Sequence, residues 1–271
     1  MNNIRLSDIP PVVRNLIIIN ALMLLVTWVL ENAFGIDLGQ ILGLHYFKSE
    51  MFHPYQYVTH IFMHGGLMHL FFNMFALWMF GRILETVWGS KKFFIYFIVT
   101  GLGAAALHTF VIHLQMTSII NDINAFSNTP SPEGFAILIK KSFTEINPQH
   151  YREFLSSWYS NPDNPNYIGA AKELLNKYLD FKMNIPTVGA SGAVFGVLLA
   201  FGMLFPNTQL MLLFPPIPIK AKYFVIGYGV LELWLGLTRP GSNIAHFAHL
   251  GGMLFGFILL KYWKSKRSDF Y

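Results

Sequence analysis

The chain has 271 residues, of which 54% are hydrophobic and only 12% are charged. So few charges beside long apolar runs are typical of an integral membrane protein and exclude an ordinary soluble domain. The net charge of +5 comes mostly from lysines and arginines at the ends of apolar runs, which indicates membrane topology and no nucleic-acid partner. The absence of cysteine excludes disulfides and thiol catalysis.

Apolar runs predict six membrane-spanning helices and therefore an all-α, polytopic bundle. With its flanks, each run approaches the roughly 20 residues that a helix needs to cross a bilayer. The segment 31–59 between the first two runs carries aromatic residues and is expected to lie on the membrane surface. The six spans are expected at 16–30, 60–80, 93–112, 187–205, 223–237 and 243–263.

Residues 114–185 interrupt this pattern with a polar segment that is too long for an ordinary connection. Within it, apolar residues recur at helical spacing and predict at least one amphipathic helix. These residues are Ile168, Ala171, Leu174, Leu175, Tyr178 and Leu179. The chain is thus expected to divide into a tail with spans one to three (1–113), an insertion (114–185), and spans four to six with a basic tail (186–271). The spans together form a single domain.

Basic residues predict the orientation of the six spans. They gather at both termini and in the loops around 82–92 and 220–222, all of which fall on one side of the membrane. The positive-inside rule places that side, with both termini, in the cytoplasm and the insertion outside. Spans two, four and six then run in the same direction. At 1.5 Å per residue, Ser191 lies about 6 Å, His249 about 9 Å, and His69 and Asn73 about 13 to 20 Å below the starts of their spans.

Ser191 stands among small residues, in the stretch Gly189-Ala190-Ser191-Gly192, at the start of the fourth span. Such small residues allow two helix backbones to approach closely, so packing alone is one interpretation of this motif. The other interpretation is that Ser191 is a nucleophile, which requires a nearby group able to take its proton.

The sixth span offers such a group in His249, one turn before Gly252 and followed by Gly256. The spacing of these glycines repeats that of Gly192 and Gly196, so spans four and six are expected to meet there. Ser191 and His249 would form a dyad, since spans two, four and six carry no deep acidic residue to orient the base. His246 is expected to be a neighbour that orients water or the loop.

An acyl-transfer site also needs donors for the oxyanion that develops in the reaction. His69 and Asn73 are four residues apart and share a helix face, which suits joint binding of one group. The backbone N–H of Ser191, near a helix N-terminus, is a third expected donor.

Together these residues resemble the rhomboid family of intramembrane serine proteases. The resemblance covers all six spans and rests on Gly189-Ala190-Ser191-Gly192, on His64-x4-His69-x3-Asn73, and on Ala248-His249-x2-Gly252-x3-Gly256. It implies that Ser191 is the nucleophile, His249 its base, and His69 and Asn73 part of the oxyanion site. Supporting positions are His64, Gly189, Gly192 and Gly252, with Glu85 in a structural role near the cytoplasmic end.

The chain departs from the pattern of many bacterial members at three places. Phe195 stands where they have a tyrosine stacked beneath the histidine, so the stacking surface remains and a hydroxyl is lost. The first loop has His53-Pro54-Tyr55-Gln56-Tyr57 in place of a Trp-Arg pair, and the insertion is longer than their short connection. None of these departures removes a group that the reaction needs.

The resemblance implies cleavage of transmembrane protein substrates within the lipid bilayer, near its outer boundary. It implies no cofactor and no metal, and suggests the bacterial inner membrane as the location. A silent relative that binds membrane clients is one alternative, although such relatives typically lose the serine or the histidine. A metal or ion transporter is another alternative, with ligands from His60, His64, His69, His246 and His249. Glu232 is the only acidic residue that lies deep within a predicted span.

Glycines in the fifth span, Gly227, Gly229 and Gly236, suggest loose packing there. We expect this span, with the loop 239–242, to act as a lateral gate for substrate.

Overall fold

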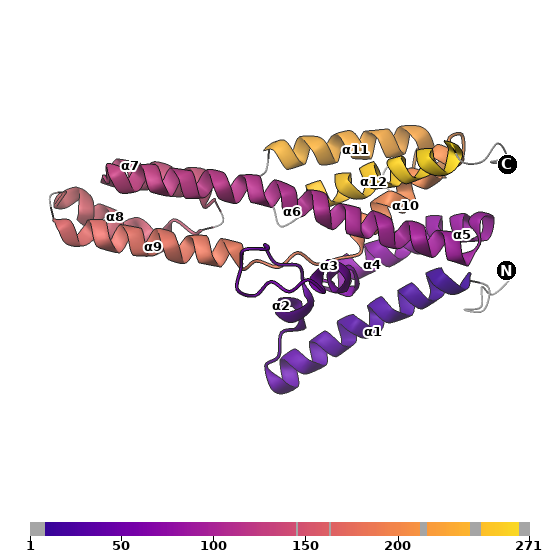
Figure 1. The fold of residues 1–271 in the computed structure, drawn as a ribbon, viewed down its shortest axis with the longest axis horizontal. Coiled ribbons are helices and arrows are strands. Elements are labelled where there is room, and N and C mark those ends of the chain that lie inside the picture. The colour runs from indigo at the N-terminus through magenta and orange to yellow at the C-terminus, as the bar shows by residue number, and fades with distance from the viewer. Residues whose placement is uncertain (1–8, 145, 163, 212–215, 239–244, 266–271) are drawn as a thin grey trace.

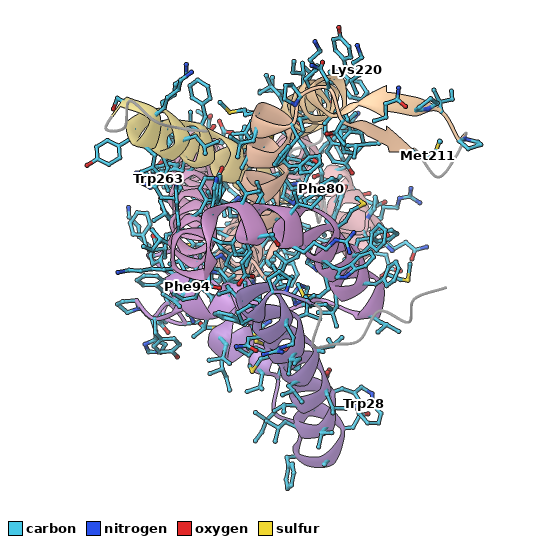
Figure 2. The ribbon with its side chains drawn as sticks, turned by 90° about the vertical axis from the view of Figure 1, so that its right-hand side faces the viewer. Trp28, Phe80, Phe94, Met211, Lys220 and Trp263 are labelled. Carbon is cyan, nitrogen blue, oxygen red and sulfur yellow. The ribbon has the colours of Figure 1, made fainter. Side chains whose placement is uncertain are left out.

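The computed structural model describes residues 9–144, 146–162, 164–211, 216–238 and 245–265, and most of them are helical (Figure 1). The strands found in this part of the chain are β1 (Gln209–Met211) and β2 (Pro218–Lys220), which pair antiparallel in a short hairpin that the sequence analysis did not predict. In Figure 2 this hairpin, marked by Met211 and Lys220, projects from the helices. The fold is that of an all-α polytopic membrane protein.

Helix α1 (Pro11–Phe34) begins with a proline in its first turn and ends at Gly35, whose φ is 67°. Proline suits a first turn because its fixed φ is helical and its missing N–H has no partner there. Apolar side chains such as Leu22, Leu25 and Trp28 are exposed, and Figure 2 shows Trp28 pointing away from the bundle. An exposed apolar surface of this length suits contact with lipid.

Three helical segments of the described chain are long and apolar enough to cross a bilayer. They are α1, the run Leu67–Trp88, and α6 (Ser90–Asn128). Helix α10 (Ser191–Leu204) is apolar but has only 14 residues. The count of six spans therefore stays a prediction.

The second predicted span begins later and ends later than the range 60–80. Before it come the short helices α2 (Leu38–Leu42) and α3 (Gln56–Thr59) and the 3-10 turn η2 (His60–Phe62). The chain then bends at Gly66, whose φ of 151° breaks the helix. The span itself runs without interruption through α4 (Leu67–Ala76), the π-helical turn η3 (Leu77–Gly81) and α5 (Arg82–Trp88).

This shift corrects the depth expected for His69 and Asn73. Counted from Leu67, they lie about 3 and 9 Å along their helix, whereas Ser191 is the first residue of α10 and His249 lies about 5 Å along α12. The predicted loop at 82–92 shrinks to a turn at Gly89, since Arg82 continues the helix.

Helix α6 has 39 residues, so the predicted boundary between 113 and 114 falls inside it. The insertion continues with α7 (Pro132–Ser142), α8 (Gln149–Ser160) and α9 (Pro165–Met183). The amphipathic helix predicted over 168–179 is thus confirmed as the middle of α9. In Figure 1 these helices pack beside the C-terminal half of α6, at the opposite end of the molecule from the start of α1 and the end of α12 (His246–Ser265).

Most of the buried apolar residues belong to one of two clusters with no member in common. One lies among the apolar helices around Leu77, Phe97 and Phe201, and the other joins α6 to the insertion around Phe135 and Trp158. Helix α10 lies in the first cluster and packs against α6, α12 and α11 (Ala221–Thr238). Ser191, the first residue of α10, is therefore held from several sides.

Candidate active site

Ser191 follows a bend that only glycine accommodates well. Gly189 has a φ of 129°, and its N–H donates to the carbonyl of His60 at 2.9 Å. A Cβ on Gly189 would lie 2.8 Å from Nε2 of His69. The bend turns the chain into α10 at Ser191, whose N–H, at the first helical position, has no acceptor within its own helix.

The structure brings the hydroxyl of Ser191 to the imidazole of His249. The Oγ–Nε2 distance is 2.8 Å, within hydrogen-bonding range, and it joins α10 to α12. The ring of Phe195 stacks on that of His249, with centroids 4.1 Å apart and an interplanar angle of 4°. The histidine is thus held on one face by an aromatic ring and at its edge by the serine.

Close backbone contact at Gly252 makes this approach possible. A Cβ there would overlap the carbonyl group of Gly192. The expectation that Gly196 and Gly256 serve the same contact is wrong, because both face α6. A Cβ on Gly196 would meet Thr100 at 2.6 Å, and a Cβ on Gly256 would meet the hydroxyl of Tyr96, which itself donates to the Gly196 carbonyl.

A carboxylate that the sequence analysis did not assign to the site lies behind the histidine. Glu232, on α11, is only 5% exposed. Its Oε2 lies 2.9 Å from Nδ1 of His249 and 2.6 Å from Nδ1 of His246. Glu232 belongs to the fifth predicted span, whereas an acid near His249 was sought only in spans two, four and six.

His69 and Asn73, the expected oxyanion donors, lie on α4 near the serine. The imidazole of His69 packs against Gly189, two residues before Ser191. The side-chain amide of Asn73 donates to the backbone carbonyl of His69 at 3.0 Å, which leaves its second N–H for another acceptor. His64 packs edge-on against His69, and neither of its ring nitrogens has a hydrogen-bond partner among the described residues.

Glu85 lies far from this group, at the end of the second span. Its carboxylate accepts hydrogen bonds from the backbone N–H groups of Val12 and Val13 at 2.9 and 2.8 Å, and from Ser90 Oγ at 2.7 Å. It joins the first turn of α1 to the turn between α5 and α6, which is a structural contact.

A cavity of about 1170 Å³ connects these groups. Its wall includes Ser191 and His249 together with His69 and Asn73, and aromatic residues from α4 and α11 complete it. A cavity lined by apolar side chains with a few converging polar groups is typical of a substrate site.

Metal ligation is possible at one place in the described chain. The side-chain atoms of Glu232, His246 and His249 lie within 4.8 Å of one another. His60 and His64, which the transporter interpretation needs, do not join this set. His60 instead bonds through Nδ1 to the carbonyl of Gln56 at 2.8 Å. The two histidines that do join it already share the carboxylate of Glu232.

Sequence comparisons identify similar proteins. An uncharacterised mitochondrial rhomboid protein of Schizosaccharomyces pombe is 28% identical over 217 residues, which cover 77% of this chain and 51% of the relative. The mitochondrial rhomboid protein 1 of Saccharomyces cerevisiae is 24% identical over 76% of this chain and 40% of its own length. The rhomboid protease GlpG of Klebsiella pneumoniae is 32% identical over 82 residues, 30% of each chain. The chain thus spans about half or less of the curated relatives it matches.

These relatives bear on location as well as on family. The chain is an integral membrane protein, but the bacterial inner membrane is not supported, because the first two relatives are mitochondrial. The cytoplasmic placement of the termini stays a prediction. The Rhomboid domain matches residues 51–121 and 165–265, more than half of the sequence. These ranges include the helical run Leu67–Trp88 and the contact of Ser191 with His249. The chain belongs to the rhomboid family.

Proposed function

We propose that this protein is an intramembrane serine endopeptidase that cleaves transmembrane substrates near the outer membrane boundary. Ser191 is the nucleophile and His249 the general base. The observation that carries the proposal is the 2.8 Å contact between Ser191 Oγ and His249 Nε2, across two helices and on the wall of a large cavity. Similarity to proteins named rhomboid protease points to the same reaction.

The reaction follows from the positions of these atoms. The hydroxyl proton of Ser191 passes to Nε2 of His249 as Oγ forms a bond to the carbonyl carbon of the scissile peptide. The π electrons of the carbonyl move to its oxygen and give a tetrahedral oxyanion. When the C–N bond breaks, Nε2–H gives its proton to the leaving amine, and an acyl-enzyme remains. Water, activated by the same nitrogen, then releases the acid and restores Ser191.

The oxyanion requires donors that are in place before the reaction. The N–H of Ser191 lacks an acceptor within α10 and lies at the positive end of that helix dipole. His69 and the second amide N–H of Asn73 supply the remaining hydrogen bonds. Removal of one such donor typically lowers kcat by about 100- to 1000-fold.

The test is cleavage of a panel of single-span membrane proteins by the purified protein in lipid vesicles. Ser191→Ala should abolish cleavage and also covalent labelling by a fluorophosphonate, because the alanine has no oxygen to attack with. Thermal denaturation should match that of the wild type, since the change removes one atom. Cleavage that continues in Ser191→Ala would refute the proposal.

A non-catalytic protein that binds membrane clients is the alternative function. It predicts that the wild-type protein binds a client without cleaving it and that Ser191 resists the fluorophosphonate. Labelling of the wild type at Ser191, lost in His249→Ala, would exclude this alternative, because a serine without an activating base reacts poorly.

A further inference from the structure

The three side chains Ser191, His249 and Glu232 form a continuous chain of hydrogen bonds from three different helices. Nε2 of His249 is 2.8 Å from Ser191 Oγ, and Nδ1 of the same ring is 2.9 Å from Glu232 Oε2. The ring therefore contacts the serine and the carboxylate through its two nitrogens. Glu232 and His249 are both buried, at 5% and 8% exposed.

The two contacts of His249 determine which ring nitrogen carries the proton. A neutral imidazole carries one N–H, whereas an ionised carboxylate has only acceptors. The 2.9 Å contact to Glu232 thus requires the proton of His249 on Nδ1. Nε2 then presents its lone pair to the hydroxyl of Ser191, and this is the tautomer that a general base needs.

Glu232 also stabilises the positive charge that His249 gains during the reaction. When the serine proton reaches Nε2, the ring becomes an imidazolium, which is unfavourable in a buried, poorly polarisable environment. The carboxylate beside Nδ1 offsets that new charge, and the pair as a whole becomes neutral. The attraction is strongest after proton transfer, so it favours the transition state over the resting state.

His246 holds the carboxylate from the other side. Its Nδ1 lies 2.6 Å from the same Oε2 atom that contacts His249, and the two rings are nearly perpendicular at 89°. An N–H at Nδ1 of His246 that donates to Oε2 holds this oxygen between the two rings. His246 is thus a support for Glu232.

We propose that Glu232 is a positioning residue that completes a Ser191–His249–Glu232 triad; this inference rests on the proposed function. Glu232 holds the Nδ1–H tautomer of His249 and stays ionised throughout the reaction. The proton moves only between Ser191 Oγ, His249 Nε2, the leaving amine and the hydrolytic water, and no proton passes to the carboxylate.

The test uses Glu232→Gln in the full chain, in lipid vesicles, with a cleaved membrane substrate. The glutamine that places its NH2 group where Oε2 was donates to Nδ1, and the proton of His249 then lies on Nε2, with an N–H turned toward Ser191. We expect kcat to fall by about 1000- to 10,000-fold with KM within about twofold, as expected when only the tautomer of a catalytic histidine is wrong. Glu232→Asp keeps the charge, so its kcat should exceed that of Glu232→Gln by at least about tenfold.

Nitrogen-15 NMR of histidine-labelled protein supplies a readout that a merely structural role would not change. The wild type should show an unprotonated Nε2 at His249, assigned by its absence in His249→Asn, and Glu232→Gln should show a protonated one. Glu85→Gln is the matched control, because Glu85 is an equally buried carboxylate that accepts three hydrogen bonds far from the site. It should change neither the His249 signal nor kcat per folded molecule.

The outcomes separate the triad from the proposed function. If Ser191→Ala is inactive but Glu232→Gln cleaves as fast as the wild type with an unchanged tautomer, the triad is refuted and the protease proposal stands. If Ser191→Ala still cleaves, the protease proposal itself fails. If Glu232→Gln does not fold, an Asp variant that is folded yet no more active than Glu232→Ala would also refute the triad.

Discussion

At the scale of single residues, the geometry of the candidate site depends on a glycine as well as on its polar side chains. Gly252 lets the backbone of α12 touch the Gly192 carbonyl, and this contact sets the distance between Ser191 and His249. A methyl group there must push the two helices apart, because the atom in its way belongs to the backbone and not to a flexible side chain.

We therefore predict that Gly252→Ala lowers the free energy of unfolding by about 1 to 3 kcal/mol, as overpacking of a close contact does. It should also slow fluorophosphonate labelling of Ser191 by about 100-fold, since a shift near 1 Å misaligns the reacting groups. Thermal denaturation and the labelling rate measure the two effects.

Gly169 provides the matched control for this substitution. It lies in α9, and a Cβ there would meet nothing within 4 Å. Gly169→Ala should leave labelling unchanged and slightly raise stability, because alanine favours helix more than glycine does. Equal labelling in both variants would show that the contact at Gly252 does not set the geometry of the site.

The contact between Ser191 and His249 could be predicted from the sequence, whereas the contact between Glu232 and His249 could not. Ser191 and His249 stand beside small residues that mark a close helix contact, which is a local signal. Glu232 carries a different signal: it is an ionisable residue inside an apolar helix, which is usually functional. Its partner could not be read from spacing, because that depends on how α11 is rotated against α12.

At the scale of helices, the candidate site lies between helices that are buried to different extents. Helix α10 is buried on most sides, whereas α11 exposes a series of apolar side chains that includes Tyr223, Ile226, Val230 and Trp234. Phe75 of α4 and Phe224 of α11 both line the cavity that reaches Ser191. Under the proposed function, a substrate helix would enter from the lipid between these two elements.

We predict that joining α4 to α11 blocks cleavage of membrane substrates. The chain has no cysteine, so Phe75→Cys and Phe224→Cys can be bridged by a flexible bis-maleimide without side reactions. Bridging should lower cleavage by at least about tenfold, as expected when a gating motion is prevented. Fluorophosphonate labelling should persist, because a small probe needs no gate.

Each single-cysteine variant treated with the same reagent controls for the substitution and for the added group. Full cleavage of membrane substrates by the bridged protein would contradict gating at this position. The loop 239–242, which was expected to assist the gate, lies outside the described residues.

The boundaries of helices were less predictable than their existence. The second span was expected at 60–80, but two adjacent glycines at 65 and 66 delay the helix to Leu67. Ile61, Phe62 and Met63 are apolar and precede the glycines, so hydropathy placed the start of the span too early. Likewise α6 continues past residue 113 because its C-terminal half packs against the helices of the insertion. No local sequence pattern reveals that packing.

At the scale of the whole molecule, two hydrophobic clusters share one long helix. The N-terminal half of α6 packs among the apolar helices through residues such as Phe97. Its C-terminal half packs against the insertion through Ile123 and Phe126. Since the clusters have no residue in common, we expect disruption of one to leave the contacts of the other in place.

Trp158 tests this independence, because it is 1% exposed and lies in the aromatic centre of the insertion. We predict that Trp158→Ala destabilises the insertion by about 3 to 5 kcal/mol, the usual effect of removing a buried large aromatic side chain. Limited proteolysis should then cut within 129–183, whereas the rate of Ser191 labelling should stay within about twofold of the wild type.

Trp158→Phe is the control, since it keeps a ring and removes an indole N–H that has no hydrogen-bond partner among the described residues. Parallel loss of labelling and of protease resistance in the alanine variant would instead show that the insertion and the apolar helices unfold as one unit.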